Sequence, residues 1–328
     1  MTVAVPVRRP RVEAEDDCVL PFAVEPLDVR GRVVRLGPAL DELLANHGYP
    51  NPVARLVAEA SALGVLLSSM LKFSGRFTLQ TQTDGPVDML VVDIAAPDRV
   101  RAYVRFDEKR VAALSGVYDA GALTGSGHLA MTIERADDPN RYQGIVALEG
   151  HSLEDAAHQY FARSEQIPTR VRLAVAEEIR PGSTSGWRAG GLLAQFLPRE
   201  PKRARVADLD PGDAPQGAPR HEVTEDDAWL EAQALVETVE DHELVDPDLS
   251  SERLLYRLFN ERGVKVFRSL PIVARCRCSR ERIAELLNTF DPAQRAGMVE
   301  QGRVTVKCEF CGRSYGFDPK EIGVEQSS

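Results

Sequence analysis

Near its C-terminal end the chain carries Cys276-Arg277-Cys278 and, further along, Cys308-Glu309-Phe310-Cys311. These two motifs contain four of the five cysteines, and the fifth, Cys18, stands alone near the N-terminus. Four thiolates suit a borderline-soft ion such as Zn²⁺, and two close-spaced pairs can together form a closed tetrahedral site. The clustering favours metal or redox chemistry over a disulfide scaffold. We therefore expect one Zn²⁺ ion bound by Cys276, Cys278, Cys308 and Cys311.

Basic residues flank both cysteine pairs: Arg275, Arg277, Arg280, Arg282, Lys307 and Arg313. They can balance the net negative charge of a zinc ion held by four thiolates. They would also keep the sulfurs in the thiolate form if the metal left, which favours attack on oxidants. A plainer interpretation is that they are surface charges on a structural zinc site. The spacing alone does not separate the two.

Composition divides the 328-residue chain into five segments, and its length predicts two or three domains. We expect a flexible N-terminal tail (1–20), an α+β core domain (21–198), an acidic Pro/Gly-rich linker (199–222), a helical linker (223–270) and a zinc-binding domain (271–328). The last segment is too small to fold on an apolar core alone. Bound metal would therefore supply much of its folding free energy.

The segment 21–198 shows strand and helix patterns without the regular βαβ repeat of a nucleotide-binding fold. Pro38 and Pro52 each open a predicted helix, and apolar residues at helical spacing continue the second helix to Leu67. Another helix is expected at about 153–164. Strands are expected at 31–36, 76–82, 87–94, 101–106, 128–134, 142–148 and, as the last one, 170–175. The predicted fold class is α+β, with an antiparallel or mixed sheet covered by helices.

Two amphipathic helices are predicted in the helical linker, at 225–243 with Thr224 as N-cap and at 251–260. Both are too short to be stable alone, so they must dock on another part of the molecule. We call their apolar positions the linker stripe; it consists of Leu235, Val236, Val239, Leu254, Leu258 and Phe259.

The net charge of −10 at pH 7 is concentrated between residues 199 and 250. General electrostatic binding of nucleic acid needs a basic face, so we expect no nucleic-acid partner. No uninterrupted apolar run reaches the roughly 18 residues of a membrane helix, and no secretory signal is visible. The expectation is a cytoplasmic protein without a membrane partner. No residue set forms a catalytic motif, so we do not expect an enzyme.

The cysteine motifs resemble the redox switch of the bacterial heat shock protein 33 chaperone family. The likeness is carried by Cys276-Arg277-Cys278-Ser279-Arg280-Glu281-Arg282 and Cys308-Glu309-Phe310-Cys311-Gly312. Upstream blocks look like the same family in the same order: Leu71-Lys72-Phe73, Thr83-Asp84-Gly85-Pro86, Tyr142-Gln143-Gly144, Leu148-Glu149-Gly150, Tyr160-Phe161, Arg163-Ser164-Glu165-Gln166 and Ala189-Gly190-Gly191. The resemblance covers residues 22–325.

The resemblance implies a redox-regulated chaperone that binds unfolding proteins without ATP and prevents their aggregation under oxidative and heat stress. It implies a metastable helical linker and a zinc domain that acts as the redox switch. Such a protein is inactive when reduced and zinc-bound, and active when oxidised, partly unfolded and tending to dimerise. By residue match, the redox-active disulfides would be Cys276–Cys278 and Cys308–Cys311. The linker stripe would bind clients once the zinc domain, taken as its docking partner, unfolds.

Two other functions stay open at this point. The C-terminal segment can be a constitutive zinc-ribbon binding module, although residues 271–328 are nearly neutral rather than basic. Cys308-Glu309-Phe310-Cys311 also fits a thiol oxidoreductase, but no strand–helix context precedes it. Cys18 and the segment 199–222 match nothing in the family pattern, and Cys18 is interpreted as a tail thiol without a partner.

Overall fold

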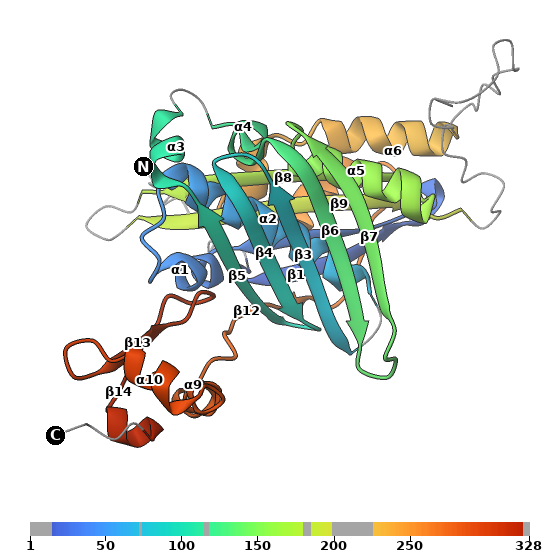
Figure 1. The fold of residues 1–328 in the computed structure, drawn as a ribbon. Coiled ribbons are helices and arrows are strands. Elements are labelled where there is room, and N and C mark those ends of the chain that lie inside the picture. The colour runs from blue at the N-terminus through green and yellow to red at the C-terminus, as the bar shows by residue number, and fades with distance from the viewer. Residues whose placement is uncertain (1–14, 72–73, 115–117, 180–184, 199–225, 324–328) are drawn as a thin grey trace, which may run out of the picture.

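Two six-stranded sheets enclose a long helix in the computed structural model, which describes residues 15–71, 74–114, 118–179, 185–198 and 226–323 (Figure 1). The first sheet has the order β10-β1-β2-β9-β8, and β11 also pairs with β1. Its strands are β1 (Cys18–Val24), β2 (Val29–Leu36), β8 (Thr169–Glu178), β9 (Gly186–Phe196), β10 (Lys265–Val266) and β11 (Leu270–Pro271).

The second sheet has the order β12-β5-β4-β3-β6-β7. Its strands are β3 (Gly75–Thr83), β4 (Val87–Ala95), β5 (Arg99–Phe106), β6 (Ser126–Arg135), β7 (Arg141–Glu149) and β12 (Val273–Ala274). The strand pairs are antiparallel in both sheets except for β12 and β5, which run parallel. The predicted α+β class is confirmed, although the structure has two sheets where the sequence pattern suggested one.

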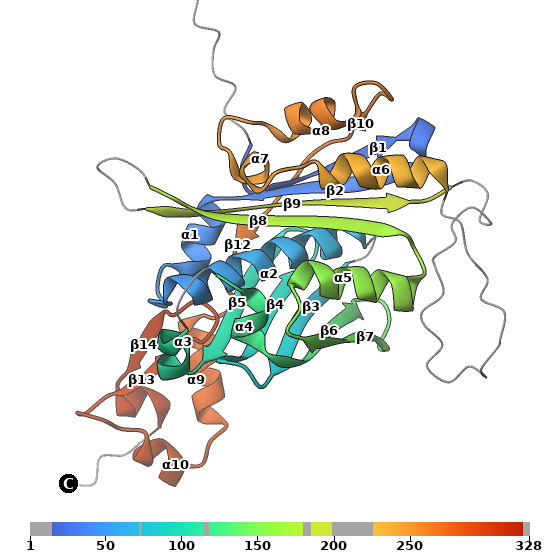
Figure 2. The same ribbon diagram turned by 90° about the horizontal axis from the view of Figure 1, so that it is seen from above.

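Helix α2 (Asn51–Met70) lies between the two sheets and forms the centre of the main core (Figure 2). Small side chains let both sheets approach it: a Cβ on Gly64 would lie only 3.1 Å from Val92 of β4. The Ser61 hydroxyl donates to the Val57 carbonyl of the same helix, which satisfies it in the core. By length and hydropathy α2 is the one described helix that could cross a membrane, but 78% of its apolar window is buried inside the protein.

Shorter helices cover the remaining edges of the core. They are α1 (Pro38–Leu44), α3 (Glu108–Ala113), α4 (Ala120–Thr124) and α5 (Leu153–Tyr160), the last continued by a π-helical turn (Phe161–Glu165). A capping box between Ser152 and Asp155 starts α5. The helices predicted at Pro38, Pro52 and 153–164 are therefore confirmed.

A long inner strand was missed: the sequence pattern ended the sheet at 170–175, whereas β9 follows and lies between β2 and β8 in the first sheet. Its small residues, including Gly190 and Gly191, weaken the sequence signal for a strand. The structure shows why they are small. A Cβ on Gly190 would lie 2.1 Å from the Leu244 carbonyl oxygen, and one on Gly191 would lie 2.7 Å from the Leu66 side chain.

The helical linker packs on the outer face of the first sheet (Figure 2). It contains α6 (Asp227–Glu237), α7 (Asp241–Val245) and α8 (Ser251–Phe259). Alternate residues of the strands serve the two faces: Val33 joins the cluster under the linker, and Val34 joins the main core around α2. Both faces of this sheet are thus buried.

The helix predicted at 225–243 is two helices, because the chain leaves helical geometry after Glu237 and restarts at Asp241. Asp226 is the N-cap of α6, and its side chain accepts a hydrogen bond from the Ala228 N–H. The N-cap predicted at Thr224 and the acidic segment 199–222 lie outside the described residues.

The C-terminal module is a separate small body, at the lower left of Figure 1. It contains α9 (Arg280–Asn288), α10 (Pro292–Gly297), β13 (Val304–Lys307), β14 (Ser314–Phe317) and a 3₁₀ turn (Pro319–Ile322). Its apolar core consists of Ile283, Leu287, Val304, Phe317 and Ile322. So few buried residues cannot offset the conformational entropy of a module of this size.

Candidate metal centre

Each cysteine pair is placed by a short, well-defined local structure. Cys276 and Cys278 follow β12, and Ser279 ends the motif by capping α9, accepting a hydrogen bond from the Arg282 N–H. Cys308 and Cys311 occupy the turn between β13 and β14. Gly312 completes that turn with φ +65°, in the left-handed region that favours glycine, and its N–H donates to the Cys308 carbonyl over 2.8 Å.

The four sulfurs form one cluster, as predicted. Their Sγ atoms all lie within 4.8 Å of one another. Two close contacts join the two motifs, at 3.7 Å between the sulfurs of Cys276 and Cys308 and 3.4 Å between those of Cys278 and Cys311. A tetrahedral site with metal–sulfur bonds of about 2.3 Å needs sulfurs about 3.8 Å apart. The donor set and its size therefore fit Zn²⁺.

The electrostatics of the cluster also call for a cation. Burial and neighbouring sulfur raise the pKa of Cys311, and burial raises the pKa of Cys308. At Cys278 burial opposes ionisation, but hydrogen bonds from the Tyr315 hydroxyl at 3.2 Å and from the other thiols outweigh it and lower its pKa to about 7. Four thiols this close cannot ionise together unless a positive ion offsets their repulsion, and a divalent ion would do so.

The module touches the second sheet and the loop between α1 and α2 through a few specific contacts that sequence patterns did not reveal. The Asn46 side chain donates to the Cys311 carbonyl over 3.1 Å. Phe310, between the two C-terminal cysteines, lies under the Arg101 guanidinium at 3.9 Å and beside the Tyr103 ring at 6.1 Å. A Cβ on Gly312 would lie 2.4 Å from the Asn46 carbonyl oxygen, so this close approach requires glycine.

The segment between the linker and the module forms short strands that pair with both sheets. β10 and β11 pair with β1, whereas β12 pairs with β5. The Ile272 N–H donates to the Asp17 carbonyl over 2.6 Å and the Arg275 N–H to the Val100 carbonyl over 3.0 Å. Three two-residue strands therefore connect the cysteine cluster to the linker.

The linker stripe is hidden, but its docking partner differs from the prediction. Val236, Val239, Leu254 and Phe259 are buried on the first sheet, and Leu235 and Leu258 pack partly buried beside them. Phe259 stacks on Phe22 of β1, with ring centroids 5.8 Å apart. The expectation that the zinc domain covers the stripe is wrong, because a large apolar sheet face offers far more burial than the small module.

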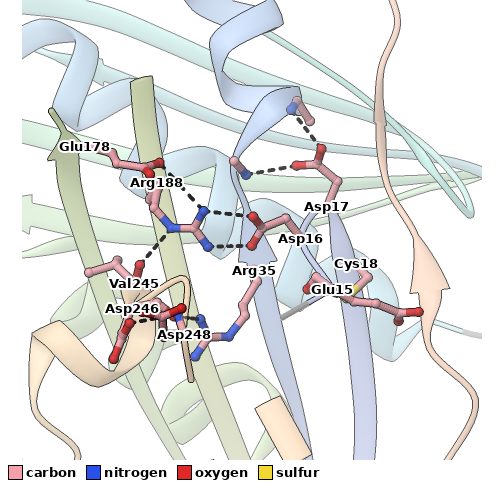
Figure 3. A network of polar contacts seen from close by, with 12 residues as sticks. Glu15, Asp16, Asp17, Cys18, Arg35, Glu178, Arg188, Val245, Asp246 and Asp248 are labelled. Carbon is pink, nitrogen blue, oxygen red and sulfur yellow. Dashed lines mark hydrogen bonds and ion pairs between the residues drawn. The ribbon is translucent and has the colours of Figure 1, made fainter. Parts of the chain in front are cut away.

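Two buried arginines of the first sheet hold the chain around α7 in place (Figure 3). Arg35, 1% exposed, donates to the Glu243 and Asp246 carbonyls, each over 2.8 Å. Arg188, 5% exposed, donates to the Val245 carbonyl over 2.7 Å and forms a two-pronged ion pair with Asp16. The last four carbonyls of a helix have no N–H partner within that helix, and α7 has only five residues. The arginine side chains supply the missing donors.

Cys18 corrects the interpretation of residues 1–20 as a loose tail, because β1 begins at this residue. Its side chain is 7% exposed, and its sulfur faces the Glu15 carbonyl at 3.3 Å. The short strand signal was masked by the acidic residues just before it. Ser251, Glu252 and Ser269 line the same small pocket as Cys18, so residues of the linker border the thiol. Burial and then Glu15 raise its pKa from 9.0 to about 11.

We expect Cys18 to resist alkylation while the linker is docked. The pKa shift alone lowers the thiolate fraction about 100-fold, and burial blocks access in addition. The measurement is iodoacetamide labelling of reduced native protein at pH 8, with the modified peptide read by mass spectrometry and denatured protein as the reference. Labelling of Cys18 at the denatured rate would contradict the buried placement.

A family model described as "Hsp33 protein" matches residues 17–318. A "33 kDa chaperonin" of Caulobacter vibrioides (strain NA1000 / CB15N) is 46% identical over 308 residues, covering 93% of this chain and 95% of that protein. One from Pseudomonas aeruginosa (strain UCBPP-PA14) is 35% identical over 303 residues, covering 92% and 91%.

A solved structure supports the fold independently of close sequence likeness. The crystal structure of a 33 kDa chaperonin, a heat shock protein 33 homologue from Thermotoga maritima, superposes with a TM-score of 0.71 at 20% identity. It covers 93% of this chain and 96% of that one. The family match spans both sheets, the linker and the cysteine cluster, and the chain therefore belongs to the Hsp33 chaperone family.

Proposed function

We propose that this protein is a redox-regulated chaperone that binds unfolding proteins without ATP, and that oxidation of the zinc-binding cysteines switches it on. The observation that carries the proposal is the convergence of four sulfurs in a module with almost no apolar core of its own. Zn²⁺ bound there would supply the cross-link that keeps the module folded. The module is then a switch whose fold depends on the oxidation state of its cysteines.

The chemical step uses only the thiols and an oxidant such as hydrogen peroxide. A thiolate attacks the peroxide, one oxygen is transferred to sulfur as a sulfenic acid, and the other leaves as water. A neighbouring thiol then attacks the sulfur of the sulfenic acid, the sulfur-bound oxygen leaves as water, and a disulfide forms. Each disulfide thus consumes one peroxide and removes two metal ligands. Following the family pattern, we assign the bonds to Cys276–Cys278 and Cys308–Cys311.

Loss of the module would weaken the linker through the connecting segment. Once residues 276–322 unfold, the two-residue strands β12, β11 and β10 lose the anchor at their C-terminal end. Such short pairings are marginal on their own. The linker is then tethered only at its N-terminal side, and its short helices depend on packing and on Arg35 and Arg188.

Release of the linker would expose two matching apolar surfaces. One is the linker stripe, and the other is the outer face of the first sheet, which includes Phe22, Val33, Leu192 and Phe196. Large exposed apolar patches bind unfolded chains, and the surrounding acidic charge would keep the complex in solution. A second copy of the chain would bury the same surfaces, which is our basis for proposing a homodimer in the oxidised state.

The remaining parts of the proposal follow from the same switch. The site contains thiols that react once per activation and no group arranged for turnover among the described residues, so we propose a chaperone rather than an enzyme. We place it in the cytoplasm, where a reducing environment keeps the cysteines metal-bound until oxidants rise. Its partners would be unfolded or oxidatively damaged proteins.

The test is suppression of light scattering by a chemically unfolded client. Protein treated with peroxide and freed of zinc should suppress aggregation at near-stoichiometric amounts, whereas reduced zinc-loaded protein should not. Cys18→Ala, which removes the thiol outside the cluster, is the matched control and should switch like the wild type. Equal activity of the reduced and oxidised forms would refute the switch and favour a constitutive binding module.

A further inference from the structure

A polar cavity of about 550 Å³ lies where the second sheet meets the start of the module. Its lining contains Arg99 and Arg101 of β5, Arg275, Arg277 and Arg282, together with Asp93, Ala95, Cys276 and Cys278. Cys308 and Cys311 are not part of the lining. The volume lies in the range of pockets that bind small molecules. The cavity therefore adjoins the metal site, shares two of its four cysteines and extends beyond it along β5.

The arginines of this cavity are only partly neutralised by the protein: Arg99 pairs with Asp98 at 3.6 Å and Arg101 pairs with Asp93. Asp93 is the one acidic residue in the lining, and it is already bonded to Arg101 over 2.6 Å and paired with Arg76 at 3.4 Å. Within the described part of the chain, the side chains of Arg275 and Arg277 have no ion pair. Asp93 and the roughly two negative charges of a zinc tetrathiolate leave the five arginines of the lining with an excess of about two positive charges.

We propose that this arginine cavity binds a small oligophosphate anion. Guanidinium groups recognise phosphate through paired, charge-assisted hydrogen bonds, and cations on several sides require a ligand with several anionic groups. The arginines converge on one cavity rather than forming a row, which disfavours a nucleic-acid strand. The described lining contains no aromatic side chain on which a nucleobase could stack, which favours inorganic oligophosphate over a nucleotide.

Such a ligand would bridge the core and the switch. Arg99 and Arg101 belong to the second sheet, whereas Arg275, Arg277 and Arg282 belong to the connecting segment and α9. A ligand that binds only when both sides are together stabilises the docked state by mass action. This consequence rests on the proposed function: oligophosphate would delay oxidative release of the module.

The binding test uses reduced, zinc-loaded, full-length protein and isothermal titration calorimetry with sodium tripolyphosphate. We expect saturable one-to-one binding, at least tenfold tighter than that of orthophosphate and no weaker than that of ATP. The double variant R99Q/R277Q should weaken binding by tenfold or more. The control R105Q/R268Q removes the same charge from β5 and from the connecting segment, outside the cavity, and should change affinity less than twofold.

Equal weakening in the two double variants would overturn the site, because it would show general charge attraction. Tighter binding of ATP would overturn the inorganic assignment. Zinc content and circular dichroism confirm that each variant is folded. None of these readouts depends on chaperone activity, so their failure would leave the proposed function untouched.

The bridging test measures zinc release to a chelating dye after peroxide addition. At 100 times the dissociation constant, tripolyphosphate should slow release at least tenfold in wild type and in R105Q/R268Q, but not in R99Q/R277Q. The variants also control for chelation of zinc by the phosphate itself, which would act on all three proteins alike. Binding without slower release, or equal slowing in all three, would overturn the bridging role.

Discussion

Removal of the metal from fully reduced protein is expected to unfold residues 276–322 and to leave both six-stranded sheets intact. The module buries only five apolar side chains, whereas a structural zinc site contributes an apparent 10–16 kcal/mol, about the folding free energy of a whole domain. Loss of that contribution cannot be offset by the few contacts at Asn46, Phe310 and β12. Folding of the module and metal binding should therefore be one transition.

The measurement is a ¹⁵N–¹H correlation spectrum before and after addition of a strong chelator with reductant present. Amide signals of the module should collapse to unfolded positions, and those of α2 and β9 should not move. Cys308→Ser, which removes one ligand, should reproduce the effect, and Cys18→Ala should not. Dispersed, protected module amides in metal-free protein would show that its fold does not need the ion.

The variant Arg35→Met is expected to loosen the linker even when the cysteines are reduced. It leaves the Glu243 and Asp246 carbonyls without their donor in a largely buried setting, at a cost of about 1–3 kcal/mol each. The two together correspond to roughly a 30-fold or larger shift of the linker equilibrium toward release. Arg188 and the apolar contacts would still hold part of the docked population.

Alkylation of Cys18 reports this shift, because the thiol is buried and Ser251 and Glu252 of the linker line the same small pocket. Labelling should accelerate by about the same factor in Arg35→Met. Arg30→Met is the matched control, since Arg30 lies on the same strand with an exposed side chain, and it should label like the wild type. Equal rates in the two variants would show that Arg35 does not secure the linker.

Elements whose signal lies in the spacing of neighbouring residues were mostly predicted correctly. Pro52 with its apolar period predicted α2, and the alternation at 76–82 predicted β3. The cysteine spacing predicted the cluster because each pair is placed by local structure, the first between β12 and α9 and the second in the turn between β13 and β14. Those features need no knowledge of the tertiary contacts.

Features set by distant contacts were not predictable in this way. Gly190 and Gly191 reflect the approach of Leu244 and Leu66, and without that knowledge β9 reads as a glycine-rich loop. Arg35 and Arg188 look like surface charges in a strand until the carbonyls of α7 are placed beside them. The periodicity of the linker stripe shows which of its residues are apolar, but it does not show which surface they pack on. That surface depends on which sheet faces the rest of the fold leaves uncovered.

The central claim is that oxidation of the four clustered cysteines releases the linker from the first sheet, and backbone hydrogen exchange tests it most directly. In reduced zinc-loaded protein, amides of α6, α7 and α8 should be protected. In peroxide-treated, zinc-free protein they should exchange at unfolded rates while α2 stays protected. Unchanged protection of α6–α8 in fully oxidised protein that suppresses client aggregation would contradict the account.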